Sequence, residues 1–129
     1  MNILLDTCAI LFLSNDDPCI TGSVRTALNE ATSVFVSPIS AAELACLQER
    51  KRIILPTHWK LWFREAVRRN SWQVLDITMT VAEEAYSLPD TFHPDPADRI
   101  LTATARLNQL KLLTTDRKLL DYPHVHAAW

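Results

Sequence analysis

The chain has 129 residues, of which 48% are hydrophobic; 13 Lys and Arg stand against 15 Asp and Glu, and Gly22 is the only glycine. This length suits one domain, and the apolar fraction is sufficient for a core. A single glycine excludes P-loops and dinucleotide-binding loops, because these need several glycines where backbone approaches phosphate. Three cysteines without Cys-x-x-Cys spacing, and no apolar run near the roughly 20 residues that span a bilayer, predict a cytoplasmic protein without membrane contact.

The predicted elements follow from hydrophobic periodicity and from turn-forming residues. A short apolar run ends at Asp6, and residues 15–18, which finish in Pro18, stop the helix that follows it. In chain order we expect strand 2–5, helices 7–13 and 23–31, strand 33–37, helices 40–50 and 58–69, strand 72–77, helices 81–88 and 97–110, strand 111–115, helix 117–121 and a last strand within 124–129. Strands that alternate with helices over short connections predict one α/β domain over 1–129, with a mainly parallel sheet of four to five strands and helices on both faces.

Acidic residues fall where the predicted strands end and the next helices begin. Asp6 closes the first strand and Asp116 the fourth, while Glu43 and Asp98 lie near the starts of two helices. Because all strands of a parallel sheet point the same way, these junctions meet at one edge, where α/β proteins place their ligands. Carboxylates from distant parts of the chain are therefore expected to converge.

Helix capping is an alternative explanation for each acid taken alone. Ser40 with Glu43 matches a capping box, Asp95 with Asp98 matches an N-cap and an N3 acid, and Asp6 can equally cap a helix. Capping does not explain why Asp6 follows so apolar a strand or why Glu43 lies in an otherwise apolar helix. Burying several ionised groups together is expensive unless a cation compensates them, and oxygen ligands favour Mg²⁺ or Mn²⁺.

Four segments in the right order carry a family resemblance that runs essentially from end to end. They are ILLDT at 3–7, SPISAAEL at 37–44, HPDPADRIL at 93–101 and LTTD at 113–116, with Tyr122-Pro123 and Trp129 closing the chain. The sequence resembles the PIN-domain ribonucleases and, among them, the VapC-like toxins of bacterial toxin–antitoxin pairs. The resemblance implies a catalytic quartet of Asp6, Glu43, Asp98 and Asp116. Supporting or substrate-contacting roles are expected for Asp95, Thr114, Ser40 and Arg99, with Asp95 an N-cap first and a ligand second.

The same resemblance implies hydrolysis of RNA phosphodiester bonds that depends on Mg²⁺ or Mn²⁺. Asp6, Asp98 and Asp116 are the expected metal ligands, and Glu43 binds metal or orients the attacking water. Bound cations would activate water and stabilise charge on the phosphate, so no protein nucleophile is required. The implied partners are RNA, a cognate VapB-like antitoxin and a second copy of the chain in a homodimer. The alternative is a catalytically silent PIN-like scaffold that binds protein or RNA.

Three further features receive an interpretation. The Trp-rich face of helix 58–69 is expected to be core or, where exposed, a surface for a homodimer or a helical antitoxin segment. Its basic side, formed by Lys60, Arg64 and Arg68, is interpreted first as solvated surface and second as a ridge that binds RNA or a partner. His93 precedes Asp95 by two residues; it is interpreted first as an exposed polar residue of a loop and second as a metal ligand. Cys8 and Cys46 are interpreted as small buried hydrophobes.

Overall fold

The computed structural model describes all 129 residues. Each predicted element is present with its predicted type. In chain order they are β1 (Ile3–Leu5), α1 (Thr7–Ser14), α2 (Gly22–Glu30), β2 (Val34–Val36), α3 (Pro38–Glu49), α4 (Trp59–Arg69), β3 (Gln73–Val74), α5 (Met79–Ala85), α6 (Pro96–Leu107), β4 (Lys111–Leu113), α7 (Arg117–Leu120) and β5 (Ala127–Ala128). No helix is long and apolar enough to cross a membrane.

The sheet has five strands in the order β3-β2-β1-β4-β5, and every neighbouring pair is parallel. The α/β prediction with a parallel sheet is therefore confirmed. β1 lies at the centre, with Leu4 opposite Phe35 of β2 on one side and Leu112 of β4 on the other. The chain first builds outward from β1 through β2 to β3 and then returns to the opposite side of β1. This reversal creates a switch point between β1 and β4, which is where open α/β sheets form ligand crevices.

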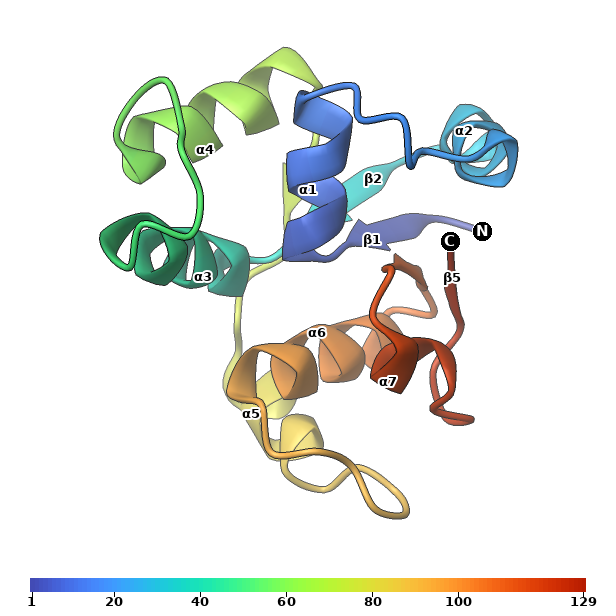
Figure 1. Ribbon diagram of the computed structural model, residues 1–129. Coiled ribbons are helices and arrows are strands. Elements are labelled where there is room, and N and C mark those ends of the chain that lie inside the picture. Colours follow the sequence, from blue (N-terminus) through green and yellow to red (C-terminus); the bar gives the residue numbers. More distant parts are fainter.

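Helices cover both faces of the sheet, as predicted, and β1 divides its side chains between them. Ile3 and Leu5 pack with α1, α2, α3 and α4, whereas Leu4 packs with α6 and α7. Figure 1 shows α1 and α4 on one side of β1 and α6 and α7 on the other. All three β1 side chains are fully buried, because successive strand residues point to opposite faces that are both covered. A rigid, two-sided core thus holds the C-terminal ends of β1 and β4.

Four helices end on non-glycine residues in the left-handed region. Asp16, Lys51, Ser71 and Gln109 have φ values of 47°, 57°, 55° and 49°. After α6, for example, the Leu110 N–H donates to Ala105 O and the Gln109 N–H donates to Arg106 O, which is a Schellman ending that usually contains glycine. Gly22, in contrast, opens α2 and has no positive φ. The chain therefore carries backbone strain at helix ends that a more glycine-rich sequence would avoid.

The interpretation of Cys8 and Cys46 as buried hydrophobes is wrong. Both residues are exposed, and so is Cys19. Cys8 lies in the first turn of α1, on a helix whose buried residues are Thr7, Ala9 and Ile10. The helix is apolar on nearly every side, so periodicity in the sequence does not distinguish which positions face the core.

Candidate functional site

The carboxyl end of β1 is the centre of the candidate site. Asp6 follows β1 directly and is only 5% exposed. Its Oδ1 accepts a hydrogen bond of 2.7 Å from the Ala9 N–H and so caps α1. Burial raises the pKa of Asp6, Asp116 raises it further, and a hydrogen bond with the Thr114 side chain counteracts the rise. The cap uses Oδ1 of this carboxylate and does not use Oδ2.

Glu43 reaches the site from α3 and is held there by Thr7. The Thr7 hydroxyl donates to Glu43 Oε1, and its Oγ1 lies 3.0 Å from Ser40 Oγ. Because one hydroxyl has a single proton, Ser40 is the donor to Thr7 when Thr7 donates to Glu43. Burial raises the pKa of Glu43, and Asp95 and Asp6 add to the rise. Ser40 and Glu43 are thus joined to the start of α1 through Thr7.

The predicted capping box of Ser40 and Glu43 is wrong. α3 begins earlier, with Ser37 as N-cap and Pro38 at its first position, so Ser40 and Glu43 lie inside the helix. Pro38 is well suited to this place, because its fixed φ fits a helix start and its missing N–H has no intrahelical partner there. The acid of this helix therefore has no capping function, and its orientation toward Thr7 needs another explanation.

Asp98 and Asp95 approach from the start of α6. Asp95 caps the helix through Oδ1, which accepts from the Ala97 N–H at 2.9 Å, so the predicted N-cap is confirmed. Asp98 lies one turn further, and its side chain is 15% exposed. Burial, followed by the charges of Asp95, Asp116, Glu43 and Asp6, raises the pKa of Asp98 to about 7. Asp98 therefore experiences all four of the other acids.

Asp116 completes the group at the end of β4. It caps α7 through Oδ1, which accepts from the Lys118 N–H at 2.9 Å, and its own N–H donates to Thr114 Oγ1 at 3.0 Å. Thr114 is fully buried and links Asp116 to Asp6. An open pocket of about 470 Å³ lies here, lined by His93, Pro94, Asp95, Pro96, Asp98, Asp116 and Lys118. The quartet predicted from the sequence, Asp6, Glu43, Asp98 and Asp116, thus shares one electrostatic environment.

The Cys8 thiol lies in the same electrostatic environment. The pKa of its thiol is raised to about 11, first by desolvation and then by the charges of Asp6, Glu43, Asp116 and Asp98. The four carboxylates of the predicted quartet, which come from different elements, therefore all act on the Cys8 sulfur. A thiol with so high a pKa is a poor nucleophile at neutral pH.

The donor chemistry of the site fits a hard divalent cation. All the acids offer oxygen, which Mg²⁺ and Mn²⁺ prefer. Burial first, and then repulsion from neighbouring acids, raises the pKa values of Asp6, Glu43 and Asp98, and a bound cation would offset both effects. As the side chains stand, no group of three or more Asp, Glu, His or Cys is drawn together closely enough to hold a metal ion. Binding therefore requires the carboxylates to rotate toward a shared point.

Arg99 is occupied elsewhere. Its guanidinium donates to Ala85 O and Phe92 O, both at 3.1 Å, and it lies over the rings of Tyr86 and Phe92 at 5.0 and 5.5 Å. These contacts tie the loop before α6 to the end of α5. The arrangement favours a structural role for Arg99 over the predicted contact with substrate.

Sequence reasoning missed Thr7 and gave a metal-ligand role for His93 only as its second interpretation. Thr7 was absent from the predicted set although it follows Asp6, because a threonine at the start of a helix is usually a local hydrogen-bonding residue. The prediction that His93 is an exposed loop residue is wrong: its side chain is only 15% exposed, and its Nε2 lies 3.3 Å from Asp98 Oδ2. For His93 the useful signal was its place five residues before an acid that opens a helix, but only the fold shows that the loop turns back.

Comparison with known families agrees with this arrangement. The PIN-domain family model matches residues 3–125. Ribonuclease VapC22 of Mycobacterium tuberculosis (strain ATCC 25618 / H37Rv) is 33% identical over 122 residues, which cover 95% of this chain and 92% of the relative. The match thus extends over all the segments that carry the acids.

Solved structures show the same fold at low sequence identity. VapBC2 from Rickettsia felis, crystallised with a DNA fragment from its promoter, superimposes with a TM-score of 0.70 at 14% identity and covers 100% of this chain and 99% of that one. A toxin–antitoxin complex from Klebsiella pneumoniae gives a TM-score of 0.67 at 19% identity, with 98% and 96% covered. These likenesses concern the fold.

Proposed function

The chain belongs to the PIN-domain family, and on that premise we propose that it is an endoribonuclease that depends on Mg²⁺ or Mn²⁺ and acts as the toxin of a VapBC-type pair. The observation that carries the proposal is the gathering of four other acids around Asp98, whose pKa is raised by burial and by their charges. A folded protein that only needed helix caps would not gather these charges around one half-buried side chain. The ribonuclease identity of the 33% identical relative supports the choice of substrate.

Each acid has a role that follows from its position. Asp6, Asp98 and Asp116 would hold the cation, since each lies at an element start and has a carboxylate oxygen beyond any used for capping. When bound, the cation supplies charge that stabilises the phosphate in the transition state and activates water. Glu43, fixed by Thr7, orients the attacking water or adds a ligand. Thr114 and Ser40 hold neighbouring side chains in place, and Asp95 contributes negative charge while it caps α6.

Cleavage of RNA by charge-neutral variants tests the site. Asp6→Asn keeps an N-cap side chain of equal size, since Asn caps as well as Asp, and Asp98→Asn keeps the size of its side chain. With total cellular RNA and Mn²⁺ or Mg²⁺, we expect the cleavage rate of each variant to fall by about a hundredfold or more. A loss of this size is typical when an electrostatic group of an active site is removed. Asp76→Asn is the matched control, since Asp76 is exposed and forms no ion pair in the structure. Full activity in either site variant, or in excess chelator, would refute the proposal.

The silent-scaffold alternative predicts a different response to metal. A formed site raises the midpoint of thermal unfolding as Mn²⁺ is added, because only the folded state binds it. We expect a rise for wild type that Asp98→Asn loses and Asp76→Asn keeps. An unchanged wild-type midpoint at millimolar Mn²⁺ would favour the scaffold.

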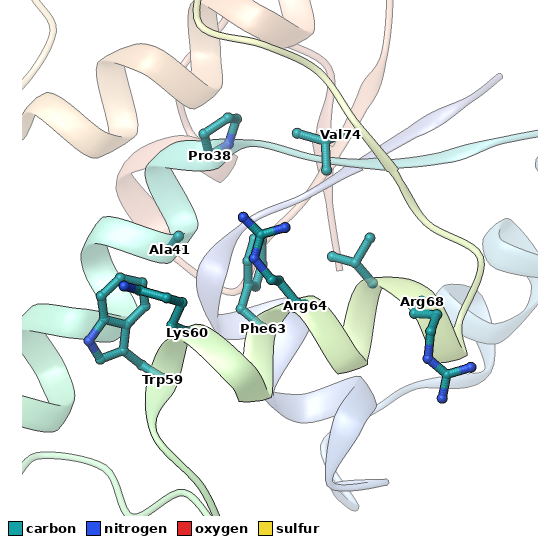
Figure 2. Close-up of a pocket in the computed structure, with 9 residues that line it drawn as sticks. Pro38, Ala41, Trp59, Lys60, Phe63, Arg64, Arg68 and Val74 are labelled. Carbon is teal, nitrogen blue, oxygen red and sulfur yellow. The ribbon is translucent and has the colours of Figure 1, made fainter.

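The antitoxin partner is part of the proposal, and a groove between α3 and α4 suits it. The groove has a volume of about 580 Å³ and combines apolar with basic residues. Its apolar lining includes Ala41, Trp59, Phe63, Val67 and Val74, and its basic lining is Lys60, Arg64 and Arg68. Figure 2 shows Ala41 of α3 on one side of the groove, with Lys60 and Arg64 rising from α4. The ridge predicted as merely solvated surface therefore borders an apolar groove, which favours an amphipathic acidic segment.

Charge reversal in the groove tests this placement. Lys60→Glu with Arg64→Glu should weaken binding of the cognate VapB-like antitoxin by tenfold or more, because both cations border the groove. Arg25→Glu on α2 is the control, since Arg25 pairs only with exposed Asp16. Equal affinities for the two variants would place the antitoxin elsewhere. A homodimer is also proposed, and sedimentation should then give twice the 14.7 kDa mass of the chain.

A further inference from the structure

His93 is held against the acidic pocket by packing. Its ring stacks on Phe92, with centroids 4.5 Å apart and planes at 26°. Phe92 is buried, and it meets Tyr122 edge to face at 4.8 Å. The Phe92 carbonyl accepts a hydrogen bond from Arg99. The loop before α6 is thus fixed on both sides, so the position of the His93 ring is set by its neighbours rather than by solvent.

The Nε2 atom of His93 is buried and has no hydrogen-bond partner. It lies 3.3 Å from Asp98 Oδ2, but the contact lacks hydrogen-bond geometry. An unpartnered buried nitrogen costs free energy unless something else occupies it. Two adjacent ligands of one octahedral cation, each about 2.1 Å from it, lie about 3.0 Å apart. The separation of Nε2 and Oδ2 is close to that value.

We propose that His93 supplies a nitrogen donor to the cation that Asp98 binds, and that this donor makes the centre prefer Mn²⁺ to Mg²⁺. The inference rests on the proposed metal-dependent function. Mg²⁺ binds oxygen and rarely accepts nitrogen, whereas imidazole increases affinity for Mn²⁺ and later transition metals. His93 is the only histidine that lines the pocket with Asp95, Asp98 and Asp116. The other histidines lie elsewhere: His58 caps α4, His124 pairs with Asp90, and His126 precedes β5.

A role in positioning Asp98 gives different results from a role as ligand. A histidine that only orients the carboxylate would affect every cation that Asp98 binds to a similar degree. A nitrogen ligand acts selectively, because its loss removes a donor that Mn²⁺ uses and Mg²⁺ does not. The ratio of the two affinities therefore separates the two roles, and it is measured without any turnover of RNA.

The test measures Mn²⁺ and Mg²⁺ binding to the full chain, together with pulsed electron paramagnetic resonance of bound Mn²⁺. His93→Phe keeps a ring that can stack on Phe92 but removes both nitrogens; His93→Gln is a second variant in case the first does not fold. His126→Phe makes the same change at an exposed histidine outside the pocket. For wild type and His126→Phe we expect nitrogen modulation in the spectrum. For His93→Phe we expect its loss, with Mn²⁺ affinity at least tenfold lower and Mg²⁺ affinity changed by less than about threefold.

Two results would overturn the inference, and they are distinguishable from failure of the proposed function. Bound Mn²⁺ without nitrogen modulation in wild type, or equal weakening of both cations in His93→Phe, would show that His93 is not a ligand while leaving the carboxylate site intact. Absence of any Mn²⁺ binding by wild type would refute the metal-dependent function itself.

Discussion

Replacing Asp98 by asparagine should make the metal-free protein more stable at high pH, although the same change should slow RNA cleavage about a hundredfold. The folded state raises the pKa of Asp98 from 3.8 to about 7, so folding favours the protonated carboxyl. Its contribution to stability is fully present below pH 3.8, declines as the pH rises, and is lost above about pH 7. An asparagine side chain at this position does not ionise and therefore escapes this loss.

The magnitude follows from the two pKa values. A rise from 3.8 to about 7 corresponds to about 4 kcal/mol across the whole titration, at 1.36 kcal/mol for each pH unit between the two values. Between pH 5 and pH 8 the unfolded Asp is already ionised and the folded one titrates near pH 7. The stability difference between Asp98→Asn and wild type should then grow by about 3 kcal/mol over this interval.

Urea unfolding in excess chelator at pH 5 and pH 8 measures the effect. The quantity compared is the difference in unfolding free energy between variant and wild type at each pH, which cancels effects common to both. Asp76→Asn, at an exposed acid outside the cluster, should give a difference that does not change with pH. A pH-independent difference for Asp98→Asn would show that Asp98 is not buried among charged neighbours. Mn²⁺ at pH 8 should stabilise wild type more than the variant.

Two further predictions concern local hydrogen bonding and helix ends. Thr7→Val keeps the shape of a side chain that is 5% exposed but removes the donor to Glu43. RNA cleavage by this variant should fall about tenfold or more, whereas cleavage by Thr7→Ser should stay near that of wild type. Equal cleavage rates for the two variants would exclude a role for the hydroxyl. Gln109, after α6, has a left-handed backbone with φ of 49°, and Gln109→Gly would relieve its strain. The free energy of unfolding measured in urea should rise by about 0.5–1 kcal/mol, because the relief of strain is partly offset by the greater entropy of the unfolded glycine variant. Gln109→Ala keeps the strain and should show no such gain, so a gain from alanine would contradict the reasoning.

Most of the fold could be predicted from the sequence because its elements are set by local patterns. Apolar runs such as 3–5 and 111–113, separated by amphipathic helices, leave few alternatives to a parallel sheet. The element edges were less predictable. β3 has two residues, Gln73–Val74, where six were expected, since it pairs only with β2 at the edge of the sheet. α3 starts at Pro38 rather than Ser40, because Ser37 caps it.

Capping and the proposed metal binding, between which the sequence left the choice open for the acids, are compatible with each other, because each cap uses one oxygen of its carboxylate. Asp6, Asp95 and Asp116 each cap a helix, and each does so with Oδ1. A helix start at the carboxyl end of a parallel strand needs a side-chain acceptor, and the local backbone amides stabilise a carboxylate there. The helix caps thereby orient acids at one edge of the sheet.

Glu43 and Asp98 cap nothing, and both have raised pKa values because they are buried beside the capping acids. Backbone hydrogen bonds partly offset the rise in the pKa of Asp6, whereas Glu43 and Asp98 have no backbone partner that counteracts burial and the charges of the capping acids. A bound cation would therefore stabilise the protein mainly through Glu43 and Asp98. Glu43→Gln and Asp98→Asn should remove most of the stabilisation by metal, measured as the rise in the midpoint of thermal unfolding with Mn²⁺. Asp95→Asn, which preserves a cap, should remove less of it. The reverse order would show that the capping acids carry the binding.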